Sequence, residues 1–254
     1  MRISVITVCF NAVTTVADAA KSVLNQTLSS DSKFEMEYII VDGGSTDGTL
    51  EALAPFRDHI ATLISEPDRG LYDAMNKGIK ASTGDVVAFL NADDVYASRD
   101  VLARVAATFR EKGGEAIYGD LHYVDAKDLT RVLRRWRSGK FRPGAFRRGW
   151  MPPHPTLYLR RCVLETYGGF DCSYPIAADY EAILRYFGSP GFKAAYIPRV
   201  LVKMRVGGES NQSLRKIIRK SHENYRALRA SGVGGLGTLA WKNLSKLGQF
   251  VRRR

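Results

Sequence analysis

The sequence predicts an α/β fold with a mostly parallel, Rossmann-like sheet flanked by helices. Strand-like and helix-like segments alternate as β-α-β-α-β-α-β over the first hundred residues, a pattern typical of parallel sheets with right-handed crossovers. Residues 86–90 are almost wholly apolar, as expected for a strand buried on both faces. The polar Asn91 stops that run, and the acids Asp93 and Asp94 follow it.

The individual elements follow from local patterns. Strands are expected at residues 3–8, 37–42, 60–65 and 86–90, and helices at 14–28, 71–81 and 100–112. The turn at residues 43–48 supplies Ser, Thr and Asp to cap a helix that runs through residue 56. We expect Ser98 to cap helix 100–112 and Gly113-Gly114 to end it.

The alternation breaks after a short strand near residues 117–120. Residues 122–155 are rich in Arg, Gly and Pro, which indicates loops or short strands. The expected elements beyond them are a strand at 156–159, helices at 161–167 and 179–187, and two basic helices at 212–230 and 236–253.

Length and composition limit the class of protein. The 254 residues, 45% of them hydrophobic, suit one large α/β domain or one domain with a small appendage. Three widely spaced cysteines, Cys9, Cys162 and Cys172, form no C-x-x-C pair and indicate structural thiols in a reducing cytosol. We expect no signal peptide and no membrane-spanning helix, since no apolar run approaches the ~20 residues that a span needs.

The net charge of +12 is unevenly distributed. Between residues 203 and 254 the only acids are Glu209 and Glu223. A strong positive charge indicates nucleic acid, an anionic membrane surface or an anionic substrate as partner. A second basic stretch has no acid within it and contains Arg131, Arg134, Arg135, Arg137, Lys140, Arg142, Arg147 and Arg148.

Acidic side chains follow two of the predicted strands. Asp42 ends strand 37–42, and Asp93 and Asp94 come after strand 86–90. Ligands of open α/β sheets bind outside the carboxyl ends of the strands, so we expect these acids to meet in one crevice. One acid would hold Mg²⁺ or Mn²⁺ bridging a diphosphate, and another a ribose hydroxyl. Two alternative interpretations need no ligand. Asp93 and Asp94 could form a solvated turn at the end of the strand, and Asp42 could stabilise the N-terminus of the following helix.

Four motifs occur in order at residues 7–11, 41–49, 68–78 and 90–94. Together they resemble the family 2 glycosyltransferases with the GT-A fold, and more narrowly the bacterial members that build exopolysaccharide, O-antigen or glycolipid glycans, such as the colanic acid transferases. The resemblance implies a GT-A domain over residues 1–210, whose first hundred residues bind the nucleotide sugar and whose residues 101–210 carry the acceptor site and base. Residues 211–254 would form a basic helical extension.

The resemblance also implies roles for individual residues. Asp94 is the main ligand of a divalent metal, Mg²⁺ or Mn²⁺, and Asp93 contacts ribose or metal. Ala92 stands where many relatives have a third acid or Thr. The implied donor-binding set is completed by Thr7, Cys9, Asn11, Asp42, Asp68, Arg69, Asn76 and Asn91.

The general base of the family lies in a late acidic motif, which this chain matches at residues 177–181. The resemblance assigns Asp179 as the base, although Ala178 replaces the usual acid and an N-cap role is also compatible. We expect Glu181 to face away from Asp179 along the helix. His154 would contact donor phosphate or acceptor, or be structural. A late loop that could close over the diphosphate contains Arg205, Gly207, Gly208 and Ser210.

The implied activity is inverting transfer of a sugar from a nucleotide-diphosphate sugar to a hydroxyl of a lipid-linked or other glycan acceptor. One alternative is a nucleotidyltransferase of related fold, which would carry a Gly-rich basic phosphate loop where residues 9–12 stand. Another is a basic nucleic-acid-binding protein, whose basic residues should interleave with aromatics on a recognisable module. Nucleic acid is therefore not an expected partner.

The basic C-terminal helices favour a peripheral place on the cytoplasmic face of the inner membrane. Lys and Arg are attracted to anionic lipid, and mixed apolar and basic helices lie in the interface. The same apolar stripe could instead pack on the domain. Its residues are Trp241, Leu244, Leu247 and Phe250.

Overall fold

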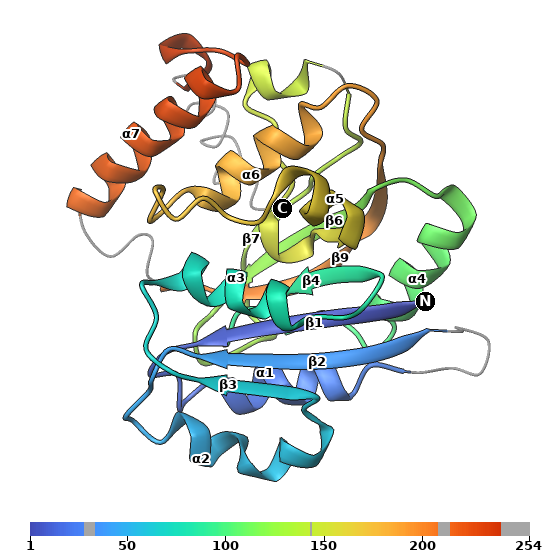
Figure 1. Cartoon of the computed structure of the whole chain (residues 1–254), viewed down its shortest axis with the longest axis vertical. Coiled ribbons are helices and arrows are strands. Elements are labelled where there is room, and N and C mark those ends of the chain that lie inside the picture. Colours follow the sequence, from blue (N-terminus) through green and yellow to red (C-terminus); the bar gives the residue numbers. More distant parts are fainter. Residues whose placement is uncertain (28–33, 143, 208–213, 240–254) are drawn as a thin grey trace.

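The computed structural model describes residues 1–27, 34–142, 144–207 and 214–239. Within these residues, nine strands form one mixed sheet with the order β3-β2-β1-β4-β8-β6-β9-β5, and β7 pairs with β6 beside that path (Figure 1). Helices cover both faces of the sheet (Figure 1). The α/β class and the flanking helices are therefore as predicted.

Four parallel strands form the first half of the sheet. They are β1 (Arg2–Cys9), β2 (Glu35–Asp42), β3 (Thr62–Ser65) and β4 (Val86–Phe89). In the register of the sheet, Cys9 lies opposite Asp42, and Asp42 lies opposite Ser65. Because parallel strands end at the same edge, the residues that follow β1, β2 and β4 are brought together there.

The second half of the sheet departs from the parallel pattern. It contains β5 (Asp94–Tyr96), β6 (Ala116–Val124), β7 (Val132–Trp136), β8 (Tyr158–Arg160) and β9 (Ala194–Arg205). Strand β8 runs antiparallel to both β4 and β6, whereas β6 and β9 are parallel. Local patterning did not predict β5 or β9, and their antiparallel pairing places Asp94 inside a strand opposite Met204.

The helices divide between two cores on opposite faces of the sheet. The first core packs against α1 (Val16–Leu24), α2 (Thr49–Leu53) and α4 (Val101–Lys112). The second packs against α3 (Leu71–Ala81), α5 (Arg161–Tyr167), α6 (Ala178–Phe187) and α7 (Leu214–Ala230). Short 3₁₀ turns complete the chain: η1 (Ala54–His59), η2 (Ala145–Arg148) and η3 (His154–Thr156).

Close packing explains the glycine inside α3. A Cβ at Gly78 would come 2.4 Å from Cγ2 of Ile6 on β1, so only glycine lets the helix approach the strand this closely. The helix itself spans the residues that the sequence predicts, Leu71 to Ala81. Its apolar residues Tyr72, Ala74 and Met75 are buried on the sheet.

Some predicted boundaries were wrong. The first helix ends at Leu24, and the helix expected through residue 56 is the short α2 followed by η1. Ser98 does not cap α4: Asp100 occupies the N-cap, and the Ser98 hydroxyl donates to its carboxylate. Strand β8 starts only at Tyr158, because residues 154–156 form η3.

The described part of the C-terminus contains α7 and a helical turn at residues 236–239. The predicted stripe of Trp241, Leu244, Leu247 and Phe250 lies outside the described residues. None of the helices in the described ranges has both the length and the apolar character required to cross a bilayer.

Candidate active site

The carboxyl edge of the parallel strands gathers three segments of the chain. The amide of Gly43 donates to the carbonyl of Cys9 at 2.9 Å, and the amide of Ala92 donates to the carbonyl of Val8 at 3.3 Å. The loop after β2 and the segment after β4 therefore flank the end of β1 on its two sides. The acids that follow these strands share one edge, as the sequence predicted.

Asp42 orders the loop that follows β2. Its carboxylate accepts from the amides of Gly44 and Ser45 and from the hydroxyls of Ser45 and Ser65. Burial opposes its ionisation, but these hydrogen bonds outweigh burial and lower the pKa of Asp42. The carboxylate is thus ionised and mostly occupied by its own loop.

Asn11 joins the loops after β1 and β2. Its side-chain oxygen accepts from the amide of Thr46 at 3.0 Å, and its own amide donates to Oγ of Ser45 at 2.8 Å. Its φ of 47° is in the left-handed region, which Asn tolerates better than most residues. Beside it, the ring of Phe10 is 64% exposed at the same edge, a feature that the sequence reasoning did not single out.

Cys9 and Thr7 are structural in this arrangement. Burial, and then the charges of Asp42 and other nearby acids, raise the pKa of Cys9, so its thiol stays neutral. Thr7 is fully buried within the sheet, and its hydroxyl accepts from Tyr38 at 3.1 Å. Both side chains are buried, so neither is presented to a nucleotide.

The three predicted donor-binding residues of the motif at residues 68–78 all have partners in the protein, and Asp68 uses only its Oδ1, which accepts from the amide of Gly70 at 2.7 Å. Asp68 approaches the loop after β2 so closely that a Cβ at Gly43 would come 2.4 Å from its Oδ2. Arg69 pairs with Asp73 at 2.9 Å, and its side chain is 83% exposed. The amide of Asn76 bonds the backbone N–H and C=O of Phe170 at 2.9 and 2.8 Å. Asn76 therefore ties α3 to the segment before α6 rather than presenting its amide to a donor.

The segment after β4 carries an incompletely satisfied acid. Asp94 is fully buried, and neither its Oδ1 nor Oδ1 of Asn91 has a hydrogen-bond partner among the described residues. Burial and the neighbouring Asp93 charge raise the pKa of Asp94 well above its usual range. Burial also raises the pKa of Asp93. A buried carboxylate oxygen without a hydrogen-bond partner is costly, so this position favours a bound cation.

The donor atoms here fit a divalent metal. Hard oxygen ligands suit Mg²⁺ and Mn²⁺, and Mg²⁺ is commonly held by one or two carboxylates while substrate phosphates and water complete its shell. In the described ranges, no group of three or more His, Cys, Asp or Glu residues could hold a metal by itself. The residues that fit are Asp94, Asp93 and Asn91, with the remaining ligands supplied by substrate.

Arg205 lies at this acidic segment, at the end of β9. It is buried, its guanidinium donates to the carbonyl of Asp93 at 2.9 Å, and it pairs with Asp18 at 2.6 Å. The expectation that it belongs to a closing loop is therefore wrong, because these contacts hold it against the body of the protein. Gly207 follows with φ of 104°, whereas Gly208 and Ser210 lie outside the described residues.

Asp179 lies in the first turn of α6, two residues after the N-cap residue Ala177, so the N-cap alternative was wrong. Its Oδ1 accepts from the hydroxyl of Tyr72 at 3.1 Å, and the same hydroxyl reaches the carbonyl of Ile176 at 3.0 Å.

Tyr123 on β6 is affected by the charges of two of the candidate acids. Burial raises the pKa of Tyr123, Arg134 lowers it, and the charges of Asp94 and Asp179 raise it further. One tyrosine therefore lies within electrostatic reach of both acids.

His154 packs behind this acid. Its ring stacks on Phe89 at 5.5 Å and meets Phe170 edge-on at 5.4 Å. Burial lowers the pKa of His154, and the charge of Asp179 only partly offsets that effect. Of the two interpretations that the sequence left open, the structure favours a neutral, buried histidine that supports the Asp179 region.

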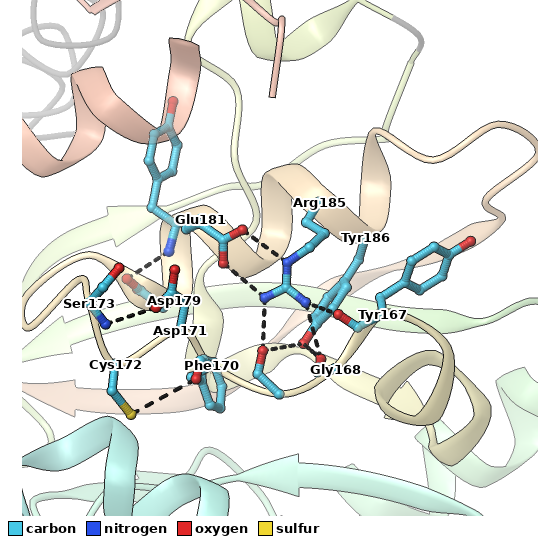
Figure 2. A network of polar contacts seen from close by, with 12 residues as sticks. Tyr167, Gly168, Phe170, Asp171, Cys172, Ser173, Asp179, Glu181, Arg185 and Tyr186 are labelled. Atoms are coloured by element: carbon cyan, nitrogen blue, oxygen red, sulfur yellow. Dashed lines mark hydrogen bonds and ion pairs between the residues drawn. The ribbon is translucent and has the colours of Figure 1, made fainter. Parts of the chain in front are cut away.

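Glu181 faces away from Asp179, as predicted. Figure 2 shows its carboxylate paired with Arg185, and the two groups lie 2.8 Å apart. Arg185 also donates to the carbonyls of Tyr167, Gly168 and Gly169. The pair thus braces the loop between α5 and α6 and leaves Asp179 as the acid of this motif near the strand edge.

Glu223 on α7 is the residue that sequence reasoning missed most clearly. It is only 4% exposed, and its Oε2 accepts from the amides of Ile176 and Ala177 at 2.8 and 2.9 Å. Its Oε1 pairs with Arg219 at 3.1 Å. The sequence signal that could have identified Glu223 is its position as a single acid within the strongly basic helix α7. Its bonds attach α7 to the segment that leads into Asp179.

The fold and this edge of acids define a class, the glycosyltransferases of GT-A fold. The model of the family described as "Glycosyl transferase family 2" matches residues 4–168. The chain belongs to that family. A glycosyltransferase rather than a nucleotidyltransferase or a nucleic-acid-binding protein is therefore the correct class.

Several proteins resemble the chain. A "PGL/p-HBAD biosynthesis glycosyltransferase" of Mycobacterium bovis is 32% identical over 189 residues, which cover 70% of this chain and 68% of that protein. The mannosyltransferase PcManGT of Pyrobaculum calidifontis, solved with GDP-Man and Mn²⁺, matches 98% of this chain and 72% of its own with a TM-score of 0.67 and 21% identity.

S. aureus TarS has a similar fold. It matches 100% of this chain with a TM-score of 0.66 and 18% identity, and the chain spans 43% of the TarS polypeptide. A structure of TarS residues 1–349 with UDP-GlcNAc gives a TM-score of 0.66 at 17% identity. The match covers 100% of this chain and 72% of that TarS chain. At these identities the neighbours establish the fold alone.

Proposed function

We propose that this protein is an inverting glycosyltransferase that moves a sugar from a nucleoside-diphosphate sugar to a hydroxyl of a lipid-linked glycan acceptor. The observation that carries the proposal is the buried carboxylate of Asp94, whose Oδ1 has no hydrogen-bond partner among the described residues. Asp94 is suited to hold the metal that binds the diphosphate, and Asp179 is suited to accept the proton of the acceptor hydroxyl.

The donor would lie across the ends of β1, β2 and β4. The exposed ring of Phe10 offers a stacking surface for the nucleobase, and Asp68 offers a carboxylate beside it. Asp94, Asp93 and Asn91 would hold the metal, which when bound supplies Lewis-acid stabilisation of the departing diphosphate. The neighbour solved with GDP-Man and Mn²⁺ supports this donor and cofactor class.

Asp179 would accept the proton of the acceptor hydroxyl as its oxygen attacks the anomeric carbon. The hydrogen bond from Tyr72 holds the carboxylate in place, and the nucleoside diphosphate leaves from the opposite face of the sugar. A positioned base contributes about 10²–10⁴-fold to rate.

The test of the base is Asp179→Asn, which should reduce transfer about 10²–10⁴-fold while donor binding is unchanged. Donor affinity is measured by calorimetry with the nucleotide sugar selected from a thermal-shift screen of UDP-, GDP- and dTDP-sugars with Mn²⁺. Glu181→Gln is the matched control, since it removes the other acid of the motif and should retain turnover. Wild-type turnover of Asp179→Asn would refute the base role.

The test of the metal site is Asp94→Asn. In the wild-type protein, Mn²⁺ should increase donor affinity, and the substitution should remove most of that increase. Calorimetry of both proteins with Mn²⁺ and with EDTA measures the difference. The same metal-dependent gain in both proteins would eliminate Asp94 as the ligand.

The lipid-linked acceptor and the membrane location have separate support. The mycobacterial relative is named for glycolipid biosynthesis. On α7, Ile217 and Ile218 are 45% and 69% exposed beside basic side chains, a composition suited to an anionic interface. We therefore propose a peripheral place on the cytoplasmic face of the inner membrane.

A further inference from the structure

A cavity of about 450 Å³ lies where β6, β7 and β9 meet, and the acids of the candidate active site do not line it. Its lining includes His122, Arg135, Arg137 and Arg199, together with Trp136 and Tyr196. The cavity has a size typical of small-ligand sites. It contains part of the basic stretch at residues 131–148 that the proposed transfer reaction leaves unexplained.

The strand register brings several of these cations together. His122 lies opposite Arg135 of β7 on one side and opposite Lys203 of β9 on the other. Arg137 directly follows the end of β7 and also lines the cavity. Arg134 lies on the other face, with its guanidinium 4.8 Å from the ring centre of Tyr123.

Three of the cations around the cavity have no acidic partner among the described residues. In the described part of the chain, no hydrogen bond or ion pair engages the side chains of Arg135, Arg137 or Lys203. Asp120 is the acid of the cavity, and its Oδ1 is occupied by the amide of Ser138 at 2.8 Å and the hydroxyl of Tyr196 at 2.7 Å. Several cations gathered around one cavity produce a positive potential there, so the arrangement favours a bound anion.

From this juxtaposition we infer that the cavity is an oxyanion site that takes a phosphate or diphosphate ester. Arginine forks match phosphate oxygens, and the aromatic side chain of Tyr196 suits the organic group that the ester carries. The volume exceeds that of a bare phosphate ion, which favours an ester. The assignment of this ester to the acceptor rests on the proposed function, whereas the anion chemistry does not.

The surroundings of His122 provide a reporter for the site. Burial lowers its pKa, and the charges of Arg135, Lys203 and Arg137 lower it further, against a smaller opposing effect of Asp120. An anion bound among these groups should therefore raise the pKa of His122. The imidazole signal is assigned by its absence from the spectrum of His122→Gln.

The experiment is an NMR titration of the full chain with inorganic pyrophosphate in EDTA, which removes metal-dependent binding at Asp94. We expect a saturable shift of the His122 signal and a higher pKa for it. The double variant R135A/R137A should weaken binding about tenfold or more, since two charge-assisted hydrogen bonds are lost. The free double variant should show a cooperative urea unfolding transition like that of the wild type, which shows that the variant is folded.

The matched control is R147A/R148A, which removes the same charge from two exposed arginines outside the cavity. It should bind pyrophosphate as the wild type does. Equal weakening by both double variants, or a His122 signal that pyrophosphate does not shift, would overturn the inference.

Two further probes identify the source of the ester. Saturable binding of a soluble short-chain alkyl diphosphate supports the acceptor as source, and R135A/R137A should then raise the acceptor KM without changing the donor KM. A His122 signal that shifts with pyrophosphate and with vesicles of anionic phospholipid, but not with the alkyl diphosphate, supports a lipid headgroup as the source. Because binding is measured without turnover, an inactive enzyme that still binds would refute only the proposed function.

Discussion

Glu223 allows the most direct test of how the structure positions Asp179. Replacing it with Ala removes the acceptor of the amides of Ile176 and Ala177, which directly precede α6. Each unpaired amide costs about 1–3 kcal/mol, so the free energy of unfolding should fall by roughly 2–5 kcal/mol, with water relieving part of the loss at Ile176. Displacing a catalytic group by about 1 Å can reduce rate about 10²-fold, so kcat should fall about 10–10²-fold.

The assays are urea unfolding and steady-state kinetics at saturating donor and acceptor. Glu223→Gln keeps one carbonyl oxygen for the two amides and should restore most of kcat. Arg219→Ala removes only a pair whose arginine is 61% exposed, which is worth about 0–1 kcal/mol. The donor KM should stay the same in all three variants, because Glu223 does not contact the donor edge. A folded Glu223→Ala protein with wild-type kcat would refute the reasoning.

Two other predictions concern stability in acid and membrane binding. The hydrogen bonds to Asp42 lower its pKa below the ordinary 3.8. The contribution of Asp42 to stability is therefore full above pH 3.8 and is lost as the pH falls through the lower pKa of the folded state. Thermal unfolding of Asp42→Asn from about pH 5 to about pH 3 should show a smaller loss of stability than that of the wild type. In flotation assays at low salt, the protein should rise with vesicles containing anionic lipid and not with neutral ones, and Ile218→Glu should weaken this binding. Equal acid sensitivity of both proteins, or no flotation with anionic vesicles, would contradict the respective expectation.

The first half of the fold could be predicted because its signals are local. A continuous apolar run marks β4, and helical spacing of apolar residues marks α3, so strand and helix alternate visibly in the sequence. Once the parallel sheet is expected, the positions of Asp42 and Asp94 at one edge follow from strand direction alone. The family motifs then indicated that Asp179 belongs with them.

The partners of the individual side chains could not be predicted in this way. Asn76 bonds the backbone of Phe170, 94 residues away, and Arg205 reaches the carbonyl of Asp93 across 112 residues. No local pattern encodes such distances, and a donor-binding assignment from a motif does not reveal whether the amide is already occupied.

The sequence by itself determined an α/β fold with acids at the ends of its strands, because hydrophobic periodicity and strand direction are properties of short segments. The resemblance to the glycosyltransferases came from its four motifs. Only the tertiary structure decided that β9 brings Arg205 beside Asp93, that α7 supplies Glu223 to the segment before Asp179, and that β6, β7 and β9 align His122 with Arg135 and Lys203. These outcomes depend on strand register and helix packing between distant segments, which are set when the whole core closes.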